Sequence, residues 1–374
     1  MRIVVNDIAA SKTGALTVLC DFYNYIIEHD HDNEWIFLLG NELLESRDNV
    51  KIIVRKDIKA SRKKRLEFDL MNGAAYLSEL NPDVVFSLQN TMPRGYKGKQ
   101  VLYVHQPLGF QKWKSFSFFK AEEREYAVYQ RLIARIIDAS VKAADKVIVQ
   151  TEWMREAVAD KTGKSADKIV KIMPDVNVPD EYIVNDGSAV NRPVNRFFFP
   201  SGNILYKNHS CIIEAVKLLK EWGMSDFRVT FTLGEDEADQ YEKYGVHEEI
   251  EYAGKLKRDD VFRRYREDVL IFPSYIETFG YPPAEARAVG GLVLASDCPF
   301  CHEVLEGYNN AYYFDPFNAN ELASLMQKIM KGEIVNRYEA DANNASESEV
   351  NSDSSWGRVV DEILATAREE SKSE

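Results

Sequence analysis

Short runs of apolar residues alternate with longer amphipathic stretches along the first half of the chain. Ile3-Val4-Val5 is an apolar run closed by the polar pair Asn6-Asp7, which is typical of a buried β-strand. From Ala15 to His29 the apolar residues recur at helical spacing, so a strand, a glycine-containing loop and a helix open the chain. Further strands are predicted at 35–39, 50–54, 82–87, 100–105 and 146–150, and helices at 61–80, at 120–144 and from 152 onward. This alternation predicts an α/β fold in which helices cover both faces of a mostly parallel sheet.

A segment rich in turn-forming residues, 179–195, divides the chain. After it the alternation restarts, with strands predicted at 197–199, 228–233, 249–252, 269–272 and 292–295 and helices at 210–222 and 283–289. We expect a loose polar loop at 341–355, followed by a helix. The domains are therefore predicted at 1–180 and 190–355, with a C-terminal helix in 356–374 that packs back on the first domain. Two doubly wound halves would hold a ligand in a cleft between them, at the carboxyl ends of the strands.

The composition is that of a globular enzyme, with 45% apolar and 29% charged residues in a chain of 374. The formal net charge of −13 argues against a general nucleic-acid-binding protein, which needs clustered lysine and arginine. The chain turns polar at Asn6, too soon for a signal peptide, and no run of about 18 apolar residues could span a membrane.

The four cysteines, Cys20, Cys211, Cys298 and Cys301, are too scattered for a disulfide framework, which favours a reducing cytoplasm. Cys298 and Cys301 have CxxC spacing, but no second such pair could complete a zinc site. We interpret them as two small residues in a loop.

The segment 272–288, FPSYIETFGYPPAEARA, carries the clearest chemistry. It starts at the end of a buried strand and continues into a helix, with Glu277 in the loop between them. Gly280 allows a ligand close to the backbone, and Pro283 suits the first turn of the helix. Free N–H groups at the helix start could bind an anion, and Glu285 would project from the first turn beside it. Two surface acids could also merely flank a helix start, but the strand, the Phe-Gly pair and the helix arrive together here.

This segment resembles the signature of glycosyltransferase family 4, retaining enzymes of the GT-B fold, with two Rossmann-like domains facing across a cleft. The resemblance implies that Glu277 contacts hydroxyls of the transferred sugar. It also implies that the backbone amides of Phe279, Gly280 and Tyr281 lie close to that sugar and the phosphates, and that Glu285 binds the ribose.

Two glycine segments extend the resemblance. Gly14 stands where the family has a glycine loop that touches the donor diphosphate, and a glycine before a helix start suits phosphate. Gly202 and Lys207 match a Gly…Lys-Asn element, in which Lys207 would neutralise the diphosphate as it departs. Many members carry an arginine where this chain has Asn203, so a second cation is not assigned.

Two weaker positions complete the predicted site. His105 follows a strand of the first half, where the family often has a histidine near the transferred sugar; a structural loop histidine is the alternative. The main chain around Lys255 and Leu256 could recognise the base. A further match, 144–154, is expected to be architectural.

The resemblance implies retention of anomeric configuration by front-face substitution, in which the departing phosphate helps to deprotonate the acceptor. No side-chain nucleophile is then required, and we find no carboxylate pair that would serve as acid and nucleophile. We expect no cofactor and a metal-independent reaction. Asp30-His31-Asp32 has DxD spacing, but we expect it to be a solvated turn away from the carboxyl ends of the strands, and 235–237 to be a solvated helix start.

Basic residues cluster at 55–65, and aromatic residues alternate with lysines at 112–120. Peripheral contact with anionic lipid and an ordinary solvated surface explain this region equally well. The lipid interpretation suits an acceptor carried on polyprenyl diphosphate.

The predicted function is a cytoplasmic glycosyltransferase, peripheral at the inner face of the membrane if lipid contact holds. It would transfer a sugar from a UDP-sugar, or with a GDP-sugar as second choice, to a glycan or lipid-linked acceptor of a bacterial surface polysaccharide. The alternatives are a sugar-nucleotide epimerase, a phosphorylase and a non-catalytic sugar-nucleotide-binding protein.

Overall fold

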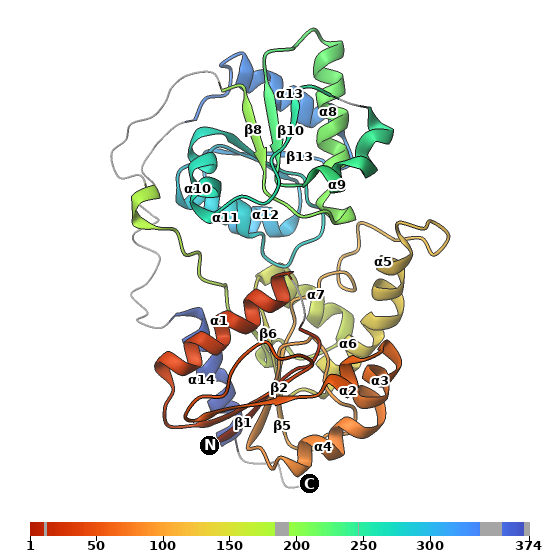
Figure 1. Cartoon of the computed structure of the whole chain (residues 1–374), viewed down its shortest axis with the longest axis vertical. Coiled ribbons are helices and arrows are strands. Elements are labelled where there is room, and N and C mark those ends of the chain that lie inside the picture. Colours follow the sequence, from red (N-terminus) through yellow and green to blue (C-terminus); the bar gives the residue numbers. More distant parts are fainter. Residues whose placement is uncertain (11–12, 184–193, 246, 337–353, 370–374) are drawn as a thin grey trace. The chain divides into compact units, whose positions relative to one another are not determined.

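The computed structural model describes residues 1–10, 13–183, 194–245, 247–336 and 354–369. The chain forms two compact units; in Figure 1 the first is coloured from red to yellow-green, with the C-terminal helix in dark blue, and the second from green to blue. The first comprises Met1–Pro174 together with Ser352–Glu374, and the second comprises Asp175–Asn351. Much of the expected boundary (184–193) and of the expected polar loop (341–353) lies outside the described residues.

A parallel sheet of seven strands, as far as the described residues extend, forms the centre of the first unit, in the order β3-β2-β1-β4-β5-β6-β7. The strands are β1 (Arg2–Asp7), β2 (Glu34–Leu39), β3 (Val50–Val54), β4 (Val84–Ser87), β5 (Lys99–Tyr103), β6 (Lys146–Val149) and β7 (Ile169–Lys171). Strand order reverses between β1 and β4, as in doubly wound folds.

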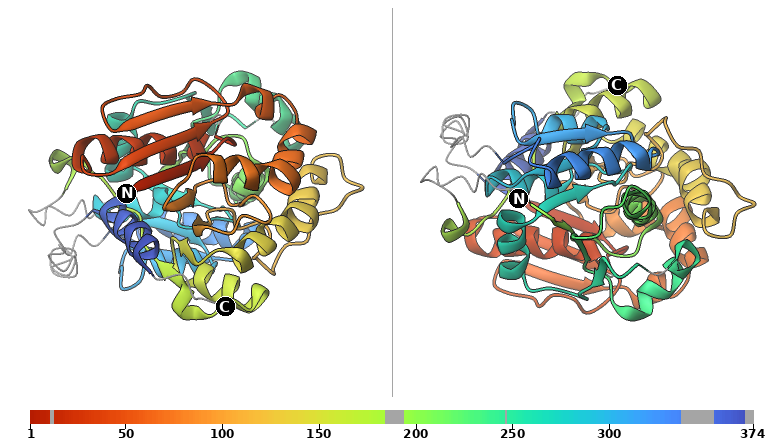
Figure 2. Two further views of the ribbon diagram at one scale, coloured as in Figure 1. Left: turned by 90° about the horizontal axis from the view of Figure 1, so that it is seen from below. Right: turned by 90° about the horizontal axis from the view of Figure 1, so that it is seen from above.

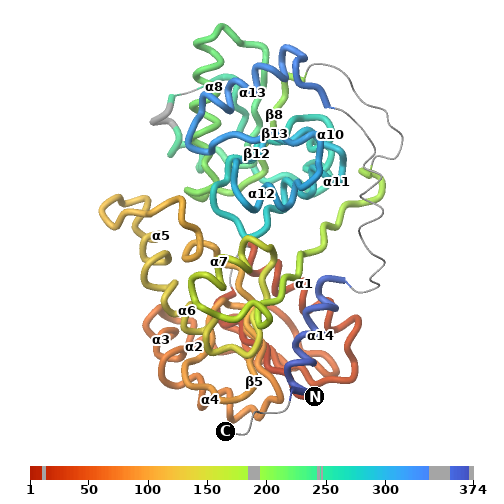
Figure 3. The backbone as a smooth tube through the Cα atoms, turned by 180° about the vertical axis from the view of Figure 1, so that it is seen from behind, coloured from red at the N-terminus to blue at the C-terminus, as the bar shows by residue number. Residues whose placement is uncertain are grey.

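Helices pack on the sheet of the first unit because its strands are buried apolar runs. They are α1 (Thr13–His29), α2 (Lys56–Lys59), α3 (Arg62–Glu67), α4 (Gly73–Glu79), α5 (Arg124–Val128), α6 (Ala134–Ala143), α7 (Glu152–Thr162) and α14 (Ser355–Arg368). The helices α1 and α14 lie side by side (Figure 3). The ring of Phe22 on α1 packs against Trp35 at 5.7 Å, Phe86 at 5.2 Å and Trp356 at 5.1 Å between centroids.

The C-terminal helix α14 is part of the core of the first unit. Val359, Val360 and Ile363 are buried in the same apolar cluster as the inward side chains of β1 and β4. The Ser354 hydroxyl accepts a hydrogen bond from the Gly357 N–H and caps the helix start.

Two long helices predicted from the sequence are interrupted. The helix expected at 61–80 contains a π-helical turn at Phe68–Asn72 between α3 and α4. The helix expected at 120–144 begins only at Arg124 and contains a second π-helical turn, Tyr129–Ile133, between α5 and α6. Such turns keep the apolar face inward while adding a residue, which the period of 3.6 cannot reveal.

The second unit repeats the doubly wound plan, with the strand order β10-β9-β8-β11-β12-β13. Its strands are β8 (Arg196–Phe199), β9 (Arg228–Phe231), β10 (Ile250–Tyr252), β11 (Val269–Phe272), β12 (Val293–Ser296) and β13 (Ala311–Phe314). Its helices are α8 (His209–Glu221), α9 (Glu235–Ala238), α10 (Arg258–Glu267), α11 (Tyr281–Ala288), α12 (Pro299–Val304) and α13 (Ala319–Met330).

The two faces of this second sheet are covered by different helices. The helices α8 and α13 pack together (Figure 2), and Phe199 of β8 contacts His209 at the start of α8. The neighbouring Phe198 points to the other face, where it contacts Tyr265 of α10. The prediction of two doubly wound, parallel α/β units is therefore confirmed.

Two smaller expectations need correction. Cys298 and Cys301 do not lie in a loop: Cys298 caps α12 and Cys301 lies within that helix, both buried. Burial raises the pKa of the Cys298 thiol to about 12, so it is not an activated thiolate. In the turn Asp30-His31-Asp32, His31 and Asp32 are exposed as expected, but Asp30 is buried, and its carboxylate accepts hydrogen bonds from the N–H groups of Asp32 and Asn33.

None of the helices in the described ranges has the length and apolar character that crossing a membrane requires.

Candidate active site

The second unit places most of its predicted residues where the strand order reverses, between β8 and β11. Ligands of doubly wound sheets bind outside the carboxyl ends of the strands at such a point. The loop after β8 carries Gly202 and Lys207, and the loop after β11 carries Glu277 and Gly280.

Lys207 and Glu277 form an ion pair across this point, with 2.5 Å between Lys207 Nζ and Glu277 Oε1. Their side chains retain 19% and 17% exposure, so both remain accessible from solvent. Residues 70 positions apart in sequence are thus brought into contact, and the two charges neutralise each other.

Asn208 holds the Lys207 loop in place. Its backbone is left-handed, with φ 64°, where asparagine is tolerated better than most residues. Its side-chain Nδ2 donates to the carbonyl oxygens of Pro273 at 3.2 Å and Pro316 at 2.7 Å. The loops after β8, β11 and β13 are therefore tied together beside Lys207.

The start of α11 differs from the expected anion site. The helix begins at Tyr281, so Pro282 and Pro283 occupy its second and third positions and supply no N–H. Amide donors at this end come from 279–281, the residues named from the resemblance. Gly280 precedes the helix with φ 97°, a conformation that glycine adopts without strain.

Glu285 lies in the second turn of α11, not in the first turn as expected, and it is buried. Its Oε2 accepts a hydrogen bond from the Tyr265 hydroxyl at 3.0 Å, and its Oε1 pairs with Arg258 at 3.0 Å. Burial raises the pKa of Glu285, while Arg258 and the Tyr265 hydroxyl oppose that rise. The Arg258 side chain is 60% exposed, so the pair can be reached from solvent.

The remaining predicted residues of this unit also follow the carboxyl ends of strands in its sheet. Gly202 is exposed, and no atom stands within 4 Å of where its Cβ would be. Asn203 accepts a hydrogen bond from the Tyr241 hydroxyl at 3.2 Å. After β10, Lys255 is exposed and Leu256 is half-buried, three and two residues respectively before Arg258, where α10 begins.

In the first unit, His105 follows β5. Its N–H donates to Asn90 Oδ1 at 2.7 Å, and its ring packs edge-on against Tyr103 at 5.6 Å. Its Nδ1 is buried and has no hydrogen-bond partner among the described residues. Burial lowers the pKa of His105 to about 4, so the imidazole is neutral near pH 7.

Gly14 lies inside the first turn of α1 rather than in the loop before it, and it is exposed.

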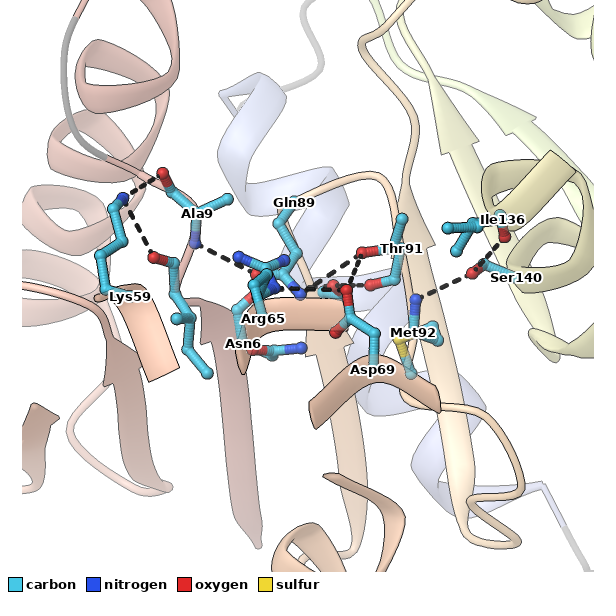
Figure 4. Close-up of polar contacts among 12 residues, drawn as sticks. Asn6, Ala9, Lys59, Arg65, Asp69, Gln89, Thr91, Met92, Ile136 and Ser140 are labelled. Atoms are coloured by element: carbon cyan, nitrogen blue, oxygen red, sulfur yellow. Dashed lines mark hydrogen bonds and ion pairs between the residues drawn. The ribbon is translucent and has the colours of Figure 1, made fainter. Parts of the chain in front are cut away.

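Sequence reasoning missed a polar network around the loop after β1. Lys59 Nζ donates to the carbonyl oxygens of Ile8 at 3.2 Å, Ala9 at 2.5 Å and Ala10 at 2.8 Å. On the opposite side, the Ala9 N–H donates to Gln89 Oε1 at 3.2 Å. Figure 4 shows Lys59 and Gln89 on the two sides of Ala9. The loop that leads into α1 is thereby clamped from both sides.

Two buried carboxylates belong to the same region. Asp69 Oδ2 accepts from Arg65 Nε at 3.2 Å and from the Thr91 hydroxyl at 3.4 Å (Figure 4). Burial raises the pKa of Asp69, and it raises that of Asp7, at the end of β1, to about 7. Arg65 and Lys59 oppose the rise at Asp7. The sequence offered one signal, which is that Asp7 is the polar end of the first apolar strand. The structure places this strand, β1, where the strand order reverses.

No group of three or more histidine, cysteine or acidic side chains in the described parts of the chain is arranged to hold a metal ion. Asp30-His31-Asp32 precedes β2 and so lies at the amino end of that strand.

Comparison with known proteins relates the second unit to a family by sequence. The sequence model described as "Glycosyl transferases group 1" matches residues 189–348. The serotype-specific mannosyltransferase WbdA of Escherichia coli is 25% identical over 245 residues, which cover 62% of this chain. The chain spans only 28% of the length of WbdA.

Solved structures share the fold over nearly the whole chain. WaaG, a glycosyltransferase involved in lipopolysaccharide biosynthesis, matches with a TM-score of 0.66 at 14% identity, covering 96% of this chain and 99% of WaaG. Anabaena HepE in complex with UDP-glucose matches with a TM-score of 0.64 at 15% identity, covering 98% and 100%. The two Rossmann-like units are thus those of GT-B glycosyltransferase structures, as the sequence predicted.

Proposed function

We propose that this chain is a retaining glycosyltransferase of family 4 that transfers a hexose from a nucleoside diphosphate to a glycan acceptor. The observation that carries the proposal is the Lys207–Glu277 pair at the point of strand reversal. The match to the glycosyltransferase family model across this unit supports it.

The two ion pairs suggest how the donor is bound. Lys207 would turn from Glu277 to the diphosphate and stabilise the charge that grows there as the sugar leaves. Glu277 would then accept hydrogen bonds from hydroxyls of the sugar. Glu285 would accept from the ribose, and the main chain at Lys255 and Leu256 would contact the base. The N–H groups of 279–281 would lie near the sugar and phosphates.

The chemical step needs no side-chain nucleophile in this proposal. The departing phosphate would take the proton of the acceptor hydroxyl, which then attacks from the same face and retains the configuration. His105, neutral because it is buried, would act as a hydrogen-bonding group toward the sugar or acceptor rather than as a nucleophile. No resident metal or cofactor enters the scheme.

The transferred sugar is proposed from the relatives. WbdA is a mannosyltransferase by name, and the matching HepE structure holds UDP-glucose. A hexose on UDP or GDP is therefore the donor class that we propose. The names of WbdA and WaaG support an acceptor in surface polysaccharide synthesis. We propose that this acceptor is a glycan, either free or linked to polyprenyl diphosphate.

A lipid-linked acceptor would bring the first unit to a membrane surface. Segments 55–72 and 112–135 carry net charges of +4 and +3 in a chain of −13. An ion pair between Arg62 and Glu125, 3.0 Å long, joins α3 of one segment to α5 of the other. Phe119 is 95% and Met71 is 74% exposed. Apolar side chains among basic residues suit contact with anionic lipid.

A donor screen tests the proposal. The purified chain is heated with UDP-glucose, UDP-galactose, GDP-mannose or the free diphosphates, since a ligand at about 100 times its Kd stabilises the native state by about 2.7 kcal/mol. The stabilising donor is then incubated with mannose oligosaccharides, and the new anomeric linkage is assigned by NMR. An inverted linkage, or stabilisation by no donor, would contradict the proposal.

The alternatives give different products. An epimerase would convert the nucleotide sugar without an acceptor, a phosphorylase would require inorganic phosphate, and a binding protein would be stabilised by the donor but release no diphosphate. Measuring free diphosphate with and without acceptor separates all three from transfer.

A further inference from the structure

An exposed aromatic ring stands beside the ion pair of the second unit. Phe317 follows β13 and is 56% exposed, more than any other large apolar side chain in the described part of that unit. An aromatic ring that is exposed at a binding edge offers an apolar face on which a ligand can stack.

The turn that carries Phe317 is fixed by its own hydrogen bonds. The Phe317 N–H donates to Asp315 Oδ1 at 2.9 Å, and the Asp315 N–H donates to Glu321 Oε2 at 2.9 Å. Asn318 Nδ2 donates to Glu321 Oε1 at 2.8 Å. A turn held in this way presents the ring in one orientation, at little entropic cost when a ligand binds.

The turn is also connected to both charged residues of the site. The Pro316 carbonyl accepts from Asn208, which adjoins Lys207. The Phe317 ring packs on Tyr275, two residues before Glu277, with 5.1 Å between centroids. Tyr275 in turn donates its N–H to the Tyr206 carbonyl at 3.1 Å. Phe317 is thus connected to each member of the ion pair through two intervening residues.

Strand order indicates which part of a ligand would meet this ring. The β10 loop, with Lys255 and Leu256, lies at one edge of the sheet, and β13 lies at the other. From β10 toward β13 the edge presents the base loop first, then Lys207 in the loop after β8, then Glu277 in the loop after β11, and last the turn after β13. Strands are spaced about 4.8 Å apart, so Phe317 lies beyond the sugar-binding glutamate, on the side away from the base.

We infer that Phe317 is a stacking surface for a pyranose ring, whose hydroxyls bind Glu277 while its apolar C–H face rests on the aromatic ring. The inference rests on the proposed function, and it adds a residue that determines sugar recognition. The pyranose is either the transferred hexose or the terminal hexose of the acceptor. These share one chemistry, and the test distinguishes them.

Phe317→Ala, Phe317→Trp and the control Trp222→Ala are compared in the full chain. Trp222 is also exposed, at 39%, but it follows the far end of α8. Calorimetric titration with GDP, GDP-mannose, UDP, UDP-glucose and mannotriose measures binding, and initial rates give KM for donor and acceptor. Phe317→Ala should lower the affinity for the hexose-bearing ligand about five- to tenfold. Phe317→Trp should keep the wild-type affinity, and Trp222→Ala should leave the affinity unchanged.

The pattern of losses identifies the pyranose. If Phe317→Ala binds GDP-mannose or UDP-glucose more weakly but binds GDP or UDP as wild type does, the stacked pyranose is the transferred hexose. If only the KM for mannotriose rises, the stacked pyranose belongs to the acceptor. Equal weakening of the free diphosphate and the nucleotide sugar would overturn the inference, as would changes of less than about twofold throughout. If the wild-type chain binds and transfers the sugar and Phe317→Ala behaves like it, only this inference is wrong. A wild-type chain that binds no nucleotide sugar defeats the proposed function, and this inference with it.

Discussion

Lys207 and Glu277 are two single residues whose charges cancel in an ion pair, and the proposed function has Lys207 leave that pair for a diphosphate. Replacing Lys207 with Met removes the cation that would stabilise the leaving group, and we expect kcat to fall about 10²- to 10³-fold. The control is Lys220→Met, which removes a comparable pair with Glu249, 3.0 Å long, at the far end of α8. Steady-state rates that keep more than a tenth of wild-type activity in Lys207→Met would contradict the role.

Asp7 makes the stability of the protein depend on pH. Its pKa is raised to about 7 in the folded chain from 3.8, so the folded state binds a proton that the unfolded state has released between these values. Stability from this residue is therefore present below about pH 4 and is lost as pH rises through 7. Asp7→Asn mimics the protonated form and lacks this loss.

The comparison of Asp7→Asn with wild type should thus change with pH. Urea unfolding at pH 5 and pH 8 should show the variant gaining about 2–3 kcal/mol over wild type across that interval. A constant difference between the two proteins would mean that Asp7 is already charged in the folded chain.

Single residues could be named from the sequence where a local pattern singles them out. Glu277 and Lys207 each follow an apolar strand in a recognisable segment, and the structure brings them into contact, while their roles in binding a donor stay predictions. Arg258 could not be named as the partner of Glu285, since their contact depends on how α10 packs against α11. The clamp of Lys59 on the β1 loop likewise joins residues about 50 positions apart, for which the sequence gives no spacing signal.

Among the elements, the start of α11 depends on one backbone conformation. Gly280→Ala would place a side chain at φ 97°, at a cost of about 1–2 kcal/mol, and would shift the backbone beside Glu277. Gly223→Ala is the matched control, because Gly223 has φ 80° and no atom within 4 Å of its Cβ position, but it lies after the far end of α8. Thermal unfolding should show both variants destabilised, and transfer assays should show only Gly280→Ala impaired. Equal transfer activity in Gly280→Ala and Gly223→Ala would show that the turn at Gly280 is not part of the active site.

The helix α14 contributes its apolar face to the first unit. Ile363 is fully buried in that core, so Ile363→Ala should cost about 2–5 kcal/mol of unfolding free energy. Asp361→Ala, on the exposed side of the same helix, should change stability by less than about 0.5 kcal/mol. Denaturant titrations that give similar midpoints would contradict the packing.

Strands were easier to predict than helices, because buried parallel strands are continuous apolar runs. β7 and β13 escaped prediction: β7 has only three residues, and β13 is half-buried, so neither forms such a run. The helix α10 also escaped, since seven of its ten residues are charged and its buried face rests on Phe262 and Tyr265. The π-helical turns beside α3 and α5 depend on packing and leave no local sequence signal.

At the scale of the whole molecule, segments 55–72 and 112–135 carry positive net charge although the chain as a whole is negatively charged. We expect the full chain to bind vesicles containing anionic phosphatidylglycerol, to ignore neutral phosphatidylcholine vesicles, and to dissociate as salt rises. The double variant Phe119→Ser, Met71→Ser should bind several-fold more weakly, and Trp222→Ser should bind like wild type. Cosedimentation measures all three, and equal binding to neutral vesicles would exclude an electrostatic contact.

Because α14 completes the core of the first unit, the chain enters the second unit and returns from it. A ribosome therefore finishes residues 175–351 before it has made Ile363. The second unit has all its strands and can fold during synthesis, whereas the first unit, though begun earlier, must wait for the last helix. A released chain that ends after residue 351 should then resist proteolysis in the later unit while the earlier one is cleaved, which reverses the usual order of domain maturation.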